Sequence, residues 1–360
     1  MQSKQNDNTR ADHQVVACRG GEETALETRP APRPGAGEML LRLRVAGFCG
    51  TDLFKLKTGS AAVGSVLGHE IVGEVIGLGP DVAGFAIGDR VVVPHHVPCG
   101  TCLYCIRGNE TMCEVFKENL MEPGGFADTV LIRPRATKEA AYKLPDGLSD
   151  EAAVFVEPAA CVLRGIDRSG LGENGTAVVL GCGSMGLLHH LVLKAALPHI
   201  SVVMIDPDRD RLAVAGRIGA DRTAVPGQDA LDAAQALTED HGADAVFDTV
   251  GGPKTLEAGI GLTRQGGSVV LFAHAPDGVH ADFDLNTLFK HERRIIGSYS
   301  GALGEQKRIF ELIRDGALDP SPLVTHTMPL DDFAHGVSLV VEQKALKVLF
   351  TPSRAAAGRS

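Results

Sequence analysis

Cys49, His69 and Glu70 are the side chains of this sequence best suited to holding a reactive metal ion. They offer a sulfur, an imidazole nitrogen and a carboxylate oxygen, and three protein ligands with one water make up a catalytic zinc site. The negative charges of Cys49 and Glu70 would cancel the charge of Zn²⁺, and the metal would still lower the pKa of a bound alcohol. Taken singly, each residue also suits a structural role: a small buried thiol, a core histidine and a surface acid. By themselves the three residues leave both explanations open.

Cys99, Cys102, Cys105 and Cys113 form a second candidate metal site, with two, two and seven residues between them. This spacing can wrap four thiolates around one tetrahedral zinc, and a closed site of this kind has no open position for a substrate. We therefore expect a structural zinc at these cysteines. Residues 1–13 are polar and contain no apolar signal core, so the eight cysteines of the chain indicate a reducing, cytoplasmic location.

Gly181, Gly183 and Gly186 follow the pattern G-x-G-x-x-G, with an apolar run before them and a helical pattern after them. The glycines allow a tight turn and the close approach of a pyrophosphate, and the helix N-terminus faces the phosphates. Asp206 lies twenty residues after Gly186, where a carboxylate accepts hydrogen bonds from both ribose hydroxyls and repels a 2′-phosphate. NAD is therefore favoured over NADP. Arg209 and Arg211 lie close after Asp206 and keep this preference moderate. The alternative, a glycine turn in a domain that binds no nucleotide, is disfavoured by Asp206.

The composition describes a soluble globular protein that is large enough for two domains. The 360 residues include 44% hydrophobic side chains, and the mean hydropathy is +0.05. The net charge of −10 argues against nucleic acid or an anionic membrane as a partner. The longest apolar stretch, 176–197, contains His189, His190 and Lys194, so we expect a strand, a turn and a helix rather than a membrane span.

Two patterns of apolar residues place these motifs on secondary structure. From residue 14 to about 132, short apolar runs alternate with glycine and proline, which predicts a β-rich domain with many turns. From residue 176 onward, apolar strands alternate with amphipathic helices, which predicts a parallel sheet with helices on both faces. The predicted strands are 39–45, 90–94, 177–180, 201–205, 245–248, 268–272 and 346–350, and the predicted helices include 209–218 and 304–315.

The motifs and their order resemble the zinc-dependent medium-chain alcohol dehydrogenase family. Gly68-His69-Glu70 with Gly73 comes first, followed by Gly88-Asp89-Arg90-Val91, the four cysteines and the glycine turn. Val156-Glu157-Pro158 and the Gly-His-Glu motif are similar to the sorbitol and threonine dehydrogenase branch. The resemblance implies an α/β fold, with a GroES-like β-rich catalytic domain and a doubly wound, parallel-sheet Rossmann domain.

The resemblance, which covers residues 14–352, also implies domain boundaries. Residues 14–165 would form the GroES-like catalytic domain, with a structural zinc lobe at about 95–115. Residues 166–297 would form the Rossmann NAD-binding domain, and residues 298–352 would return to the catalytic domain. We expect disordered tails at 1–13 and 353–360.

Ligand sets follow from the same resemblance. Cys49, His69 and Glu70 would hold or flank the catalytic zinc, and Glu157 would approach it as an alternative ligand or through water. With the structural zinc, this makes two zinc ions per subunit. The residues expected to contact NAD are Gly181, Gly183, Ser184, Met185, Gly186, Asp206, Arg211, Val250, Phe272 and Ser298.

The proton path implied by the family departs from its usual form in this chain. Thr51 matches the hydroxyl that takes the proton from the alcohol. Phe54 stands where many relatives carry a histidine that passes the proton to solvent, so the relay must end differently. A ribose hydroxyl with water is one route, and Lys55 is another candidate to assist. We expect Asp52 to fix the loop, and His95 and His96 to be packing or surface residues near the zinc lobe.

The expected function is a zinc-dependent transfer of hydride between NAD and a secondary alcohol of a polyol, sugar or related small molecule. One alternative is an NADPH-dependent carbonyl reductase of a biosynthetic pathway, and another is a non-enzymatic, zinc-stabilised nucleotide-binding protein. The expected partners are a small alcohol or ketone and further copies of the chain, in a homodimer or homotetramer, with no nucleic acid and no membrane. Which alcohol is the substrate does not follow from the sequence.

Overall fold

The computed structural model describes residues 12–357, and the chain divides into two compact units. Of the described residues, the first unit contains 12–97, 117–155 and 324–357, and the second contains 98–116 and 156–323. The four-cysteine segment therefore belongs to the second unit, to which Arg164 ties it with a hydrogen bond to the carbonyl oxygen of Gly108 at 3.5 Å. The domain boundaries proposed from the sequence stay predictions.

The first unit is built on a curled, mainly antiparallel sheet. Its strands follow the order β15-β16-β3-β4-β5-β8, and β7 pairs with both β3 and β6. The alternation of side chains explains β3, because Met39, Leu41 and Leu43 are buried while Arg42 and Arg44 are exposed. The last strand, β16, pairs with β3, so the C-terminal part of the chain joins this sheet, whereas β1 and β2 form a separate two-stranded sheet.

Four phenylalanines form the centre of the first unit's core. The side chains of Phe48, Phe126, Phe333 and Phe350 are buried, and their ring centroids lie 4.7–6.4 Å apart. Phe48 directly precedes Cys49, so this packing anchors the segment that carries the candidate metal ligand.

The helices and strands of the first unit, in chain order, have the following bounds. They are β1 (Asp12–Gly20), β2 (Glu23–Pro30), β3 (Met39–Gly47), α1 (Gly50–Thr58), β4 (Glu70–Leu78), β5 (Arg90–Pro94), β6 (Met121–Glu122), β7 (Thr129–Ile132), α3 (Pro134–Glu139), β8 (Tyr142–Lys143), α4 (Asp150–Ala153), β15 (Val324–Pro329), η3 (Leu330–Asp332), α12 (Phe333–Val341), β16 (Lys347–Thr351) and α13 (Arg354–Ala357).

Parts of the two expected tails have a defined structure. Asp12 and His13 begin β1, and residues 354–357 form α13. Ser353 is buried, and its hydroxyl donates a hydrogen bond of 2.8 Å to Asp128, which explains the order of this segment. The rest of the expected tails, 1–11 and 358–360, lies outside the described residues.

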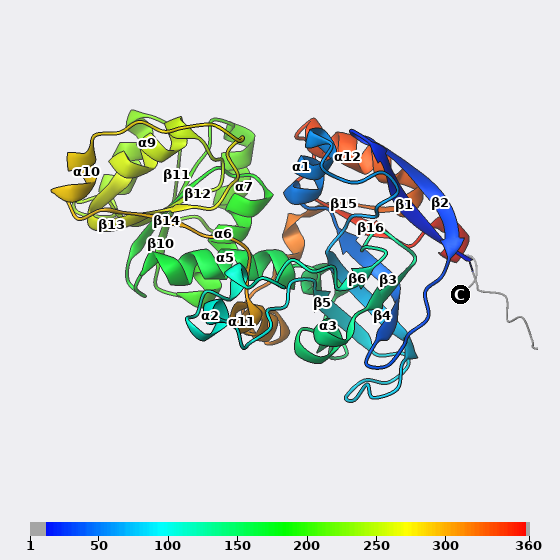
Figure 1. Ribbon diagram of the computed structural model, residues 1–360. Helices are drawn as coiled ribbons and strands as arrows, with labels where there is room; N and C mark the ends of the chain where they lie inside the picture. The colour runs from blue at the N-terminus through cyan, green and yellow to red at the C-terminus, as the bar shows by residue number, and fades with distance from the viewer. Residues whose placement is uncertain (1–11, 358–360) are drawn as a thin grey trace, which may run out of the picture. The chain divides into compact units, whose positions relative to one another are not determined.

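The second unit contains a six-stranded parallel sheet with helices packed against it. The strand order is β11-β10-β9-β12-β13-β14, so the chain reverses direction across the sheet between β9 and β12. This is the doubly wound order that binds dinucleotides at the carboxyl ends of its strands. Helices α6 and α9 pack on the central strands, and α5 contacts β13 (Figure 1). The predicted fold class is confirmed, and each predicted strand overlaps an observed one.

The helices and strands of the second unit, also in chain order, run as follows. They are α2 (Leu103–Ile106), η1 (Glu110–Met112), α5 (Val156–Ser169), β9 (Thr176–Leu180), α6 (Ser184–Ala196), β10 (Ser201–Ile205), α7 (Arg209–Arg217), β11 (Arg222–Ala224), α8 (Gln228–Gln235), β12 (Ala243–Asp248), α9 (Pro253–Leu262), β13 (Thr263–Leu271), α10 (Leu285–Phe289), β14 (Arg294–Gly297), α11 (Leu303–Arg314) and η2 (Ser321–Leu323).

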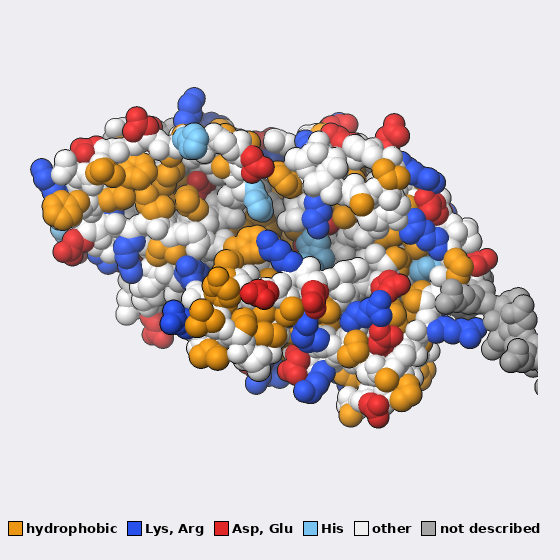
Figure 2. Space-filling view, viewed as in Figure 1, with side chains coloured by type: hydrophobic (Ala, Val, Ile, Leu, Met, Phe, Trp, Pro, Cys, Tyr) orange, Lys and Arg blue, Asp and Glu red, His pale blue; other side chains and the backbone are white. Residues whose placement is uncertain are grey.

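Apolar side chains remain at the surface of the second unit near α10. Leu285 and Phe289 are 74% and 81% exposed, and Figure 2 shows hydrophobic side chains gathered over this region. Within residues 12–357, none of the helices combines the length and apolar character needed to cross a membrane.

Candidate functional site

Cys49, His69 and Glu70 come together in the first unit. One ligand atom from each of these residues lies within 4.8 Å of the others. Cys49 caps the N-terminus of α1, His69 directly precedes β4 and Glu70 begins that strand. Because β3 leads directly into the Cys49 segment and pairs with β4, sheet register brings the thiol to the imidazole and the carboxylate. The structure therefore assembles the three donors that the sequence analysis selected.

Asp52 fixes the loop that carries Cys49, as expected from the sequence. Its Oδ2 accepts a hydrogen bond from the backbone N–H of Cys49 at 3.2 Å, and Cys49 Sγ accepts one from the N–H of Thr51 at 3.4 Å. Both contacts satisfy backbone N–H groups at the start of α1, where Cys49 and Asp52 form a capping box. Thr51 lies in the first turn of α1, two residues after Cys49, and its role as proton acceptor stays a prediction.

His69 and Asp52 form a buried pair beneath the candidate ligands. His69 Nδ1 lies 3.4 Å from Asp52 Oδ1. Burial disfavours the imidazolium, but the charges of Asp52 and Cys49 outweigh it and raise the pKa of His69 well above its usual value. Burial likewise opposes ionisation of Asp52, and the contact with His69 outweighs it and lowers the pKa of the carboxyl. A carboxylate on one ring nitrogen orients the other nitrogen for a metal, an arrangement common around zinc-bound histidines.

Lys347 is a member of this site that the sequence analysis missed. Its ammonium pairs with Glu70 Oε2 and donates a hydrogen bond to the carbonyl oxygen of Phe48 at 3.2 Å; the two charged side chains are 5% and 1% exposed. The other carboxylate oxygen, Glu70 Oε1, is buried and has no hydrogen-bond partner among the described residues. A buried carboxylate oxygen without a partner is costly unless it has a ligand, so the donor set fits a metal ion.

Gly47 makes the contact between Lys347 and Glu70 possible. In the sheet, Gly47 is paired with Glu70 on β4 on one side and with Leu349 on β16 on the other. A Cβ atom at position 47 would lie 2.1 Å from Glu70 Oε2 and 2.9 Å from Lys347 Cε. Only a residue without a side chain therefore leaves room for the pair. In the sequence, a lysine within the apolar run of β16 could have indicated a buried acidic partner, because a buried lysine is normally paired. The sequence does not show which acidic residue is that partner.

Two further histidines lie beside His69. The ring centroids of His69 and His95 are 4.5 Å apart, and those of His95 and His96 are 3.5 Å apart. Burial, followed by the neighbouring positive charges, lowers the pKa of His95 well below its usual value and that of His96 to about 3. Both rings are therefore neutral at pH 7. The expected packing role agrees with this burial, but their place against His69 was not anticipated.

The four cysteines of the second unit also converge. Their sulfur atoms lie within 4.8 Å of one another, and none of the cysteines in the described chain forms a disulfide. The Sγ atoms of Cys102 and Cys105 are 3.5 Å apart, and those of Cys99 and Cys105 are 3.9 Å apart. In a tetrahedral site with zinc–sulfur bonds of about 2.3 Å, the sulfur atoms would be about 3.8 Å apart. Hydrogen bonds from the backbone N–H groups of Thr101 and Cys102 lower the pKa of Cys99 to about 6, which favours the thiolate that zinc binds.

The glycine turn joins β9 to α6 as the sequence predicted. Gly181 has a φ of +97°, and a Cβ at Gly186 would lie 1.8 Å from the carbonyl oxygen of Gly181. Gly183 is the N-cap of α6 and provides no side-chain cap, so the N–H groups of Ser184 and Met185 in the first helical turn suit a phosphate group.

Asp206 is buried directly after β10. Its Oδ2 accepts a hydrogen bond from the N–H of Cys182 at 2.7 Å, and its Oδ1 accepts one from the N–H of Asp208 at 2.8 Å. The carboxylate thus fastens the glycine turn to the end of β10, and each oxygen keeps a second lone pair for a ribose hydroxyl. Arg211 lies one helical turn after Asp208, 3.9 Å from its carboxylate.

The remaining predicted cofactor residues follow the ends of other strands in the same sheet. Val250 is 55% exposed and lies after β12, while Phe272 and Ser298 directly follow β13 and β14. All of them therefore lie at the carboxyl edge, where doubly wound sheets bind nucleotides. Glu157 is buried in the first turn of α5 in the second unit, and its role as a zinc ligand stays a prediction.

Comparisons with known proteins match two family models and several dehydrogenases. Residues 35–146 match the model of the alcohol dehydrogenase GroES-like domain, and residues 184–315 match that of the zinc-binding dehydrogenases. The chain is 31% identical to an erythritol/L-threitol dehydrogenase of Mycolicibacterium smegmatis, over 94% of this chain and 98% of that protein. It is 30% identical to a sorbitol dehydrogenase of Halalkalibacterium halodurans, over 91% and 95% of the two chains. The solved structure of the alcohol dehydrogenase TADH from Thermus sp. ATN1 is similar with a TM-score of 0.83 and 29% identity, over 94% of this chain and 99% of that chain.

Proposed function

The chain belongs to the zinc-dependent medium-chain alcohol dehydrogenase family, and from this premise we propose that it transfers hydride between NAD and a secondary alcohol of the polyol class. The family makes it a zinc-dependent alcohol oxidoreductase. The observation that carries the proposal is the unpartnered Glu70 oxygen beside Cys49 and His69, in a chain that also holds a dinucleotide-type sheet. The polyol class rests on the relatives, which are named as erythritol/L-threitol and sorbitol dehydrogenases.

Cys49, His69 and Glu70 would hold the catalytic zinc. When bound, zinc supplies Lewis-acid chemistry, which makes the hydroxyl proton of an alcohol easier to remove. Asp52 holds His69 by its Nδ1, and Lys347 holds Glu70 by one oxygen, so both ligands are oriented before any metal arrives. Glu157 would serve as an alternative ligand.

Thr51 would accept the hydroxyl proton as the alcohol carbon gives its hydride to the nicotinamide. The alcohol then becomes a ketone, and the proton passes from Thr51 to solvent. Phe54 is 41% exposed and cannot carry a proton, so we place the exit through a cofactor ribose hydroxyl and water. In the reverse direction, the same groups return the proton to the ketone oxygen.

The four cysteines would bind a second, structural zinc, which makes two zinc ions per subunit. The sulfur separations of 3.5 and 3.9 Å support this assignment. The proposed cofactor contacts are those predicted from the sequence, with Asp206 selecting NAD. A homodimer or homotetramer and a cytoplasmic location remain predictions.

The test is a measurement of metal and activity together. We expect two zinc ions per chain and NADH formation with one or more alcohols of a polyol panel. Dialysis against a chelator should abolish this NADH formation. Cys49→Ser should lose one zinc and the turnover, whereas Cys18→Ser, a buried thiol outside the ligand sets, should keep both. Turnover that survives both the chelator and Cys49→Ser would refute the mechanism.

The choice between NAD and NADP is tested separately. Wild-type enzyme should bind NADH more tightly than NADPH. Asp206→Ala should weaken NADH binding, and it should narrow the difference in affinity between NADH and NADPH, because the carboxylate that repels a 2′-phosphate is gone. A wild-type preference for NADPH, with faster ketone reduction than alcohol oxidation, would favour the carbonyl reductase alternative. One zinc per chain with no turnover would favour the non-enzymatic alternative.

A further inference from the structure

Lys55 on helix α1 carries a positive charge on the same side of the helix as Thr51. Cys49 is the N-cap of α1, Thr51 lies in the first turn, and Lys55 follows Thr51 by four residues. Residues four apart share a face of a helix, with about 5–6 Å between their Cβ atoms. The ammonium of Lys55 is therefore carried on the face of α1 that presents the proposed proton acceptor.

The charge of Lys55 also acts on the histidines beside the candidate metal donors. Burial is the main cause of the lowered pKa of His95 and of His96, and neighbouring positive charges, that of Lys55 among them, lower both further. The centroid of the His95 ring lies 4.5 Å from that of His69, a candidate zinc ligand. The helix face and this electrostatic effect both place Lys55 beside the metal donors of the first unit.

The acidic residues of the site already have other partners. Asp52 Oδ1 lies 3.4 Å from His69 Nδ1, and Glu70 pairs with Lys347. Lys55 is half-buried, and its side chain makes no ion pair and no hydrogen bond with any of residues 12–357. Its ammonium therefore keeps three N–H donors for a ligand.

The charges of the site would balance with zinc bound, except for that of Lys55. The two positive charges of the metal would offset the thiolate of Cys49 and the carboxylate of Glu70. With a neutral imidazole as the third ligand, Lys347 and Asp52 would offset each other. Lys55 adds a positive charge that none of these groups neutralises, so the site suits a ligand that brings a negative charge.

We propose that Lys55 binds an acidic group of the alcohol substrate, a carboxylate or a phosphate, and so determines the substrate class. This inference rests on the proposed function and narrows it from neutral polyols to short polyols that carry an acidic group. Because Thr51 and Lys55 are about one helical turn apart, the acidic group would lie within a few carbons of the hydroxyl that reacts. The metal donors, Thr51 and Lys55 all belong to the first unit.

Three alcohols with the same four-carbon skeleton test the inference: erythritol, erythronate and erythritol 4-phosphate. We expect one or both anionic alcohols to exceed erythritol in kcat/KM by roughly tenfold or more. Lys55→Met should raise KM for that anion roughly 10- to 100-fold, because the ammonium contacts only the acidic group. The variant should leave kcat and the KM of erythritol unchanged, and Lys55→Arg should recover part of the loss. Whichever anion responds identifies the group as a carboxylate or a phosphate.

Lys57→Met is the matched control. Lys57 is an exposed lysine of the same helix, two residues later and so about 200° further round it. This variant should change KM for none of the three alcohols. Salt gives a second measurement, because it screens the attraction between the ammonium and the acidic group. Added salt should raise KM for the anionic alcohol in the wild type, and much less in Lys55→Met.

The inference is overturned, while the proposed function stands, if the wild type oxidises neither anion faster than erythritol. It is also overturned if Lys55→Met has no effect, or affects neutral and anionic alcohols equally; a loss of kcat with all of them would instead place Lys55 in the proton path. If none of these alcohols or of the polyol panel reduces NAD, the proposed function fails, and calorimetry with erythronate and erythritol 4-phosphate tests Lys55 by binding alone. Binding that Lys55→Met abolishes and Lys57→Met keeps would support the inference; no binding to the wild type would overturn it.

Discussion

Replacing Lys347 with methionine tests whether Glu70 depends on a buried counter-charge. The two side chains are 5% and 1% exposed, and Lys347 Nζ also lies 5.5 Å from the centroid of the Phe155 ring. Methionine keeps most of the side-chain volume and removes the charge, together with the hydrogen bond to the carbonyl oxygen of Phe48. The Lys347→Met variant therefore leaves a buried carboxylate without its partner, which costs about 3–5 kcal/mol of unfolding free energy in the metal-free protein.

The predicted loss depends on the metal. Zinc bound at Cys49, His69 and Glu70 would supply the positive charge that Lys347 no longer provides, so the zinc-loaded variant should lose much less. For a unit of roughly 150–250 residues, about 2–4 °C of Tm corresponds to 1 kcal/mol, so the metal-free Tm should fall by about 6–20 °C. Zinc should therefore raise the Tm of the variant more than it raises that of the wild type.

Urea and thermal unfolding, each with chelator and with zinc, measure both quantities. Lys344→Met is the matched control, because Lys344 is an exposed lysine that pairs with Glu342 at 2.7 Å on the surface, and it should change neither quantity. The reasoning fails if metal-free Lys347→Met is as stable as this control. It also fails if zinc stabilises Lys347→Met no more than it stabilises the wild type.

Three further predictions concern other parts of the chain. Gly47→Ala should displace Glu70 and remove one zinc per chain in a metal analysis, since the added Cβ would lie 2.1 Å from Glu70 Oε2, whereas Gly50→Ala, with nothing within 4 Å of its Cβ, should keep both zinc ions. Cys105→Ser should lose the structural zinc and lower the Tm, with hydride transfer affected only indirectly; a fully folded variant without turnover would contradict this division of roles. Burial lowers the pKa of His189 to about 4, so the folded state binds fewer protons than the unfolded state below pH 6.5, and stability should fall as the pH drops from about 6.5 to 4. His189 should account for about 2 kcal/mol of this loss between pH 7.5 and 5, and urea unfolding of His189→Leu should show a loss smaller by that amount.

The clustering of residues within one short segment could be predicted from the sequence, because chain geometry limits where those residues can lie. The four cysteines lie within fifteen consecutive residues, so their spacing alone limits them to one compact cluster. The glycine turn and Asp206 belong to one strand–helix–strand unit, whose periodicity is visible in the sequence. For Cys49, His69 and Glu70, the residues alone left a structural role open, and the family resemblance made them a set.

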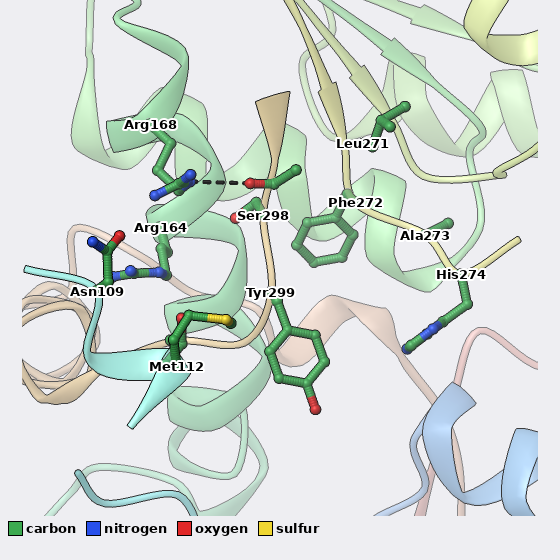
Figure 3. Close-up of a pocket in the computed structure, with 12 residues that line it drawn as sticks. Asn109, Met112, Arg164, Arg168, Leu271, Phe272, Ala273, His274, Ser298 and Tyr299 are labelled. Carbon is green, nitrogen blue, oxygen red and sulfur yellow. Dashed lines mark hydrogen bonds between the residues drawn. The ribbon is translucent and has the colours of Figure 1, made fainter. Parts of the chain in front are cut away.

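The surroundings of these sites could not be predicted, because they depend on contacts between distant segments. Lys347 reaches Glu70 across 277 positions of sequence, and any of several acids could have been its partner. The pocket drawn in Figure 3 likewise takes its lining from the four-cysteine segment, α5 and the ends of β13 and β14. Sequence spacing carries no information about such distant neighbours.

The sequence by itself determined which donors exist, how the cysteines cluster and where the nucleotide turn lies, because those features depend on neighbours along the chain. Only the tertiary structure decided which charges meet. The pairing of β16 with β3 and of β3 with β4 places Lys347 and Glu70 on either side of Gly47, which has no side chain to separate them. Because strand register sets these contacts, the counter-charge of Glu70 became visible only in the folded chain.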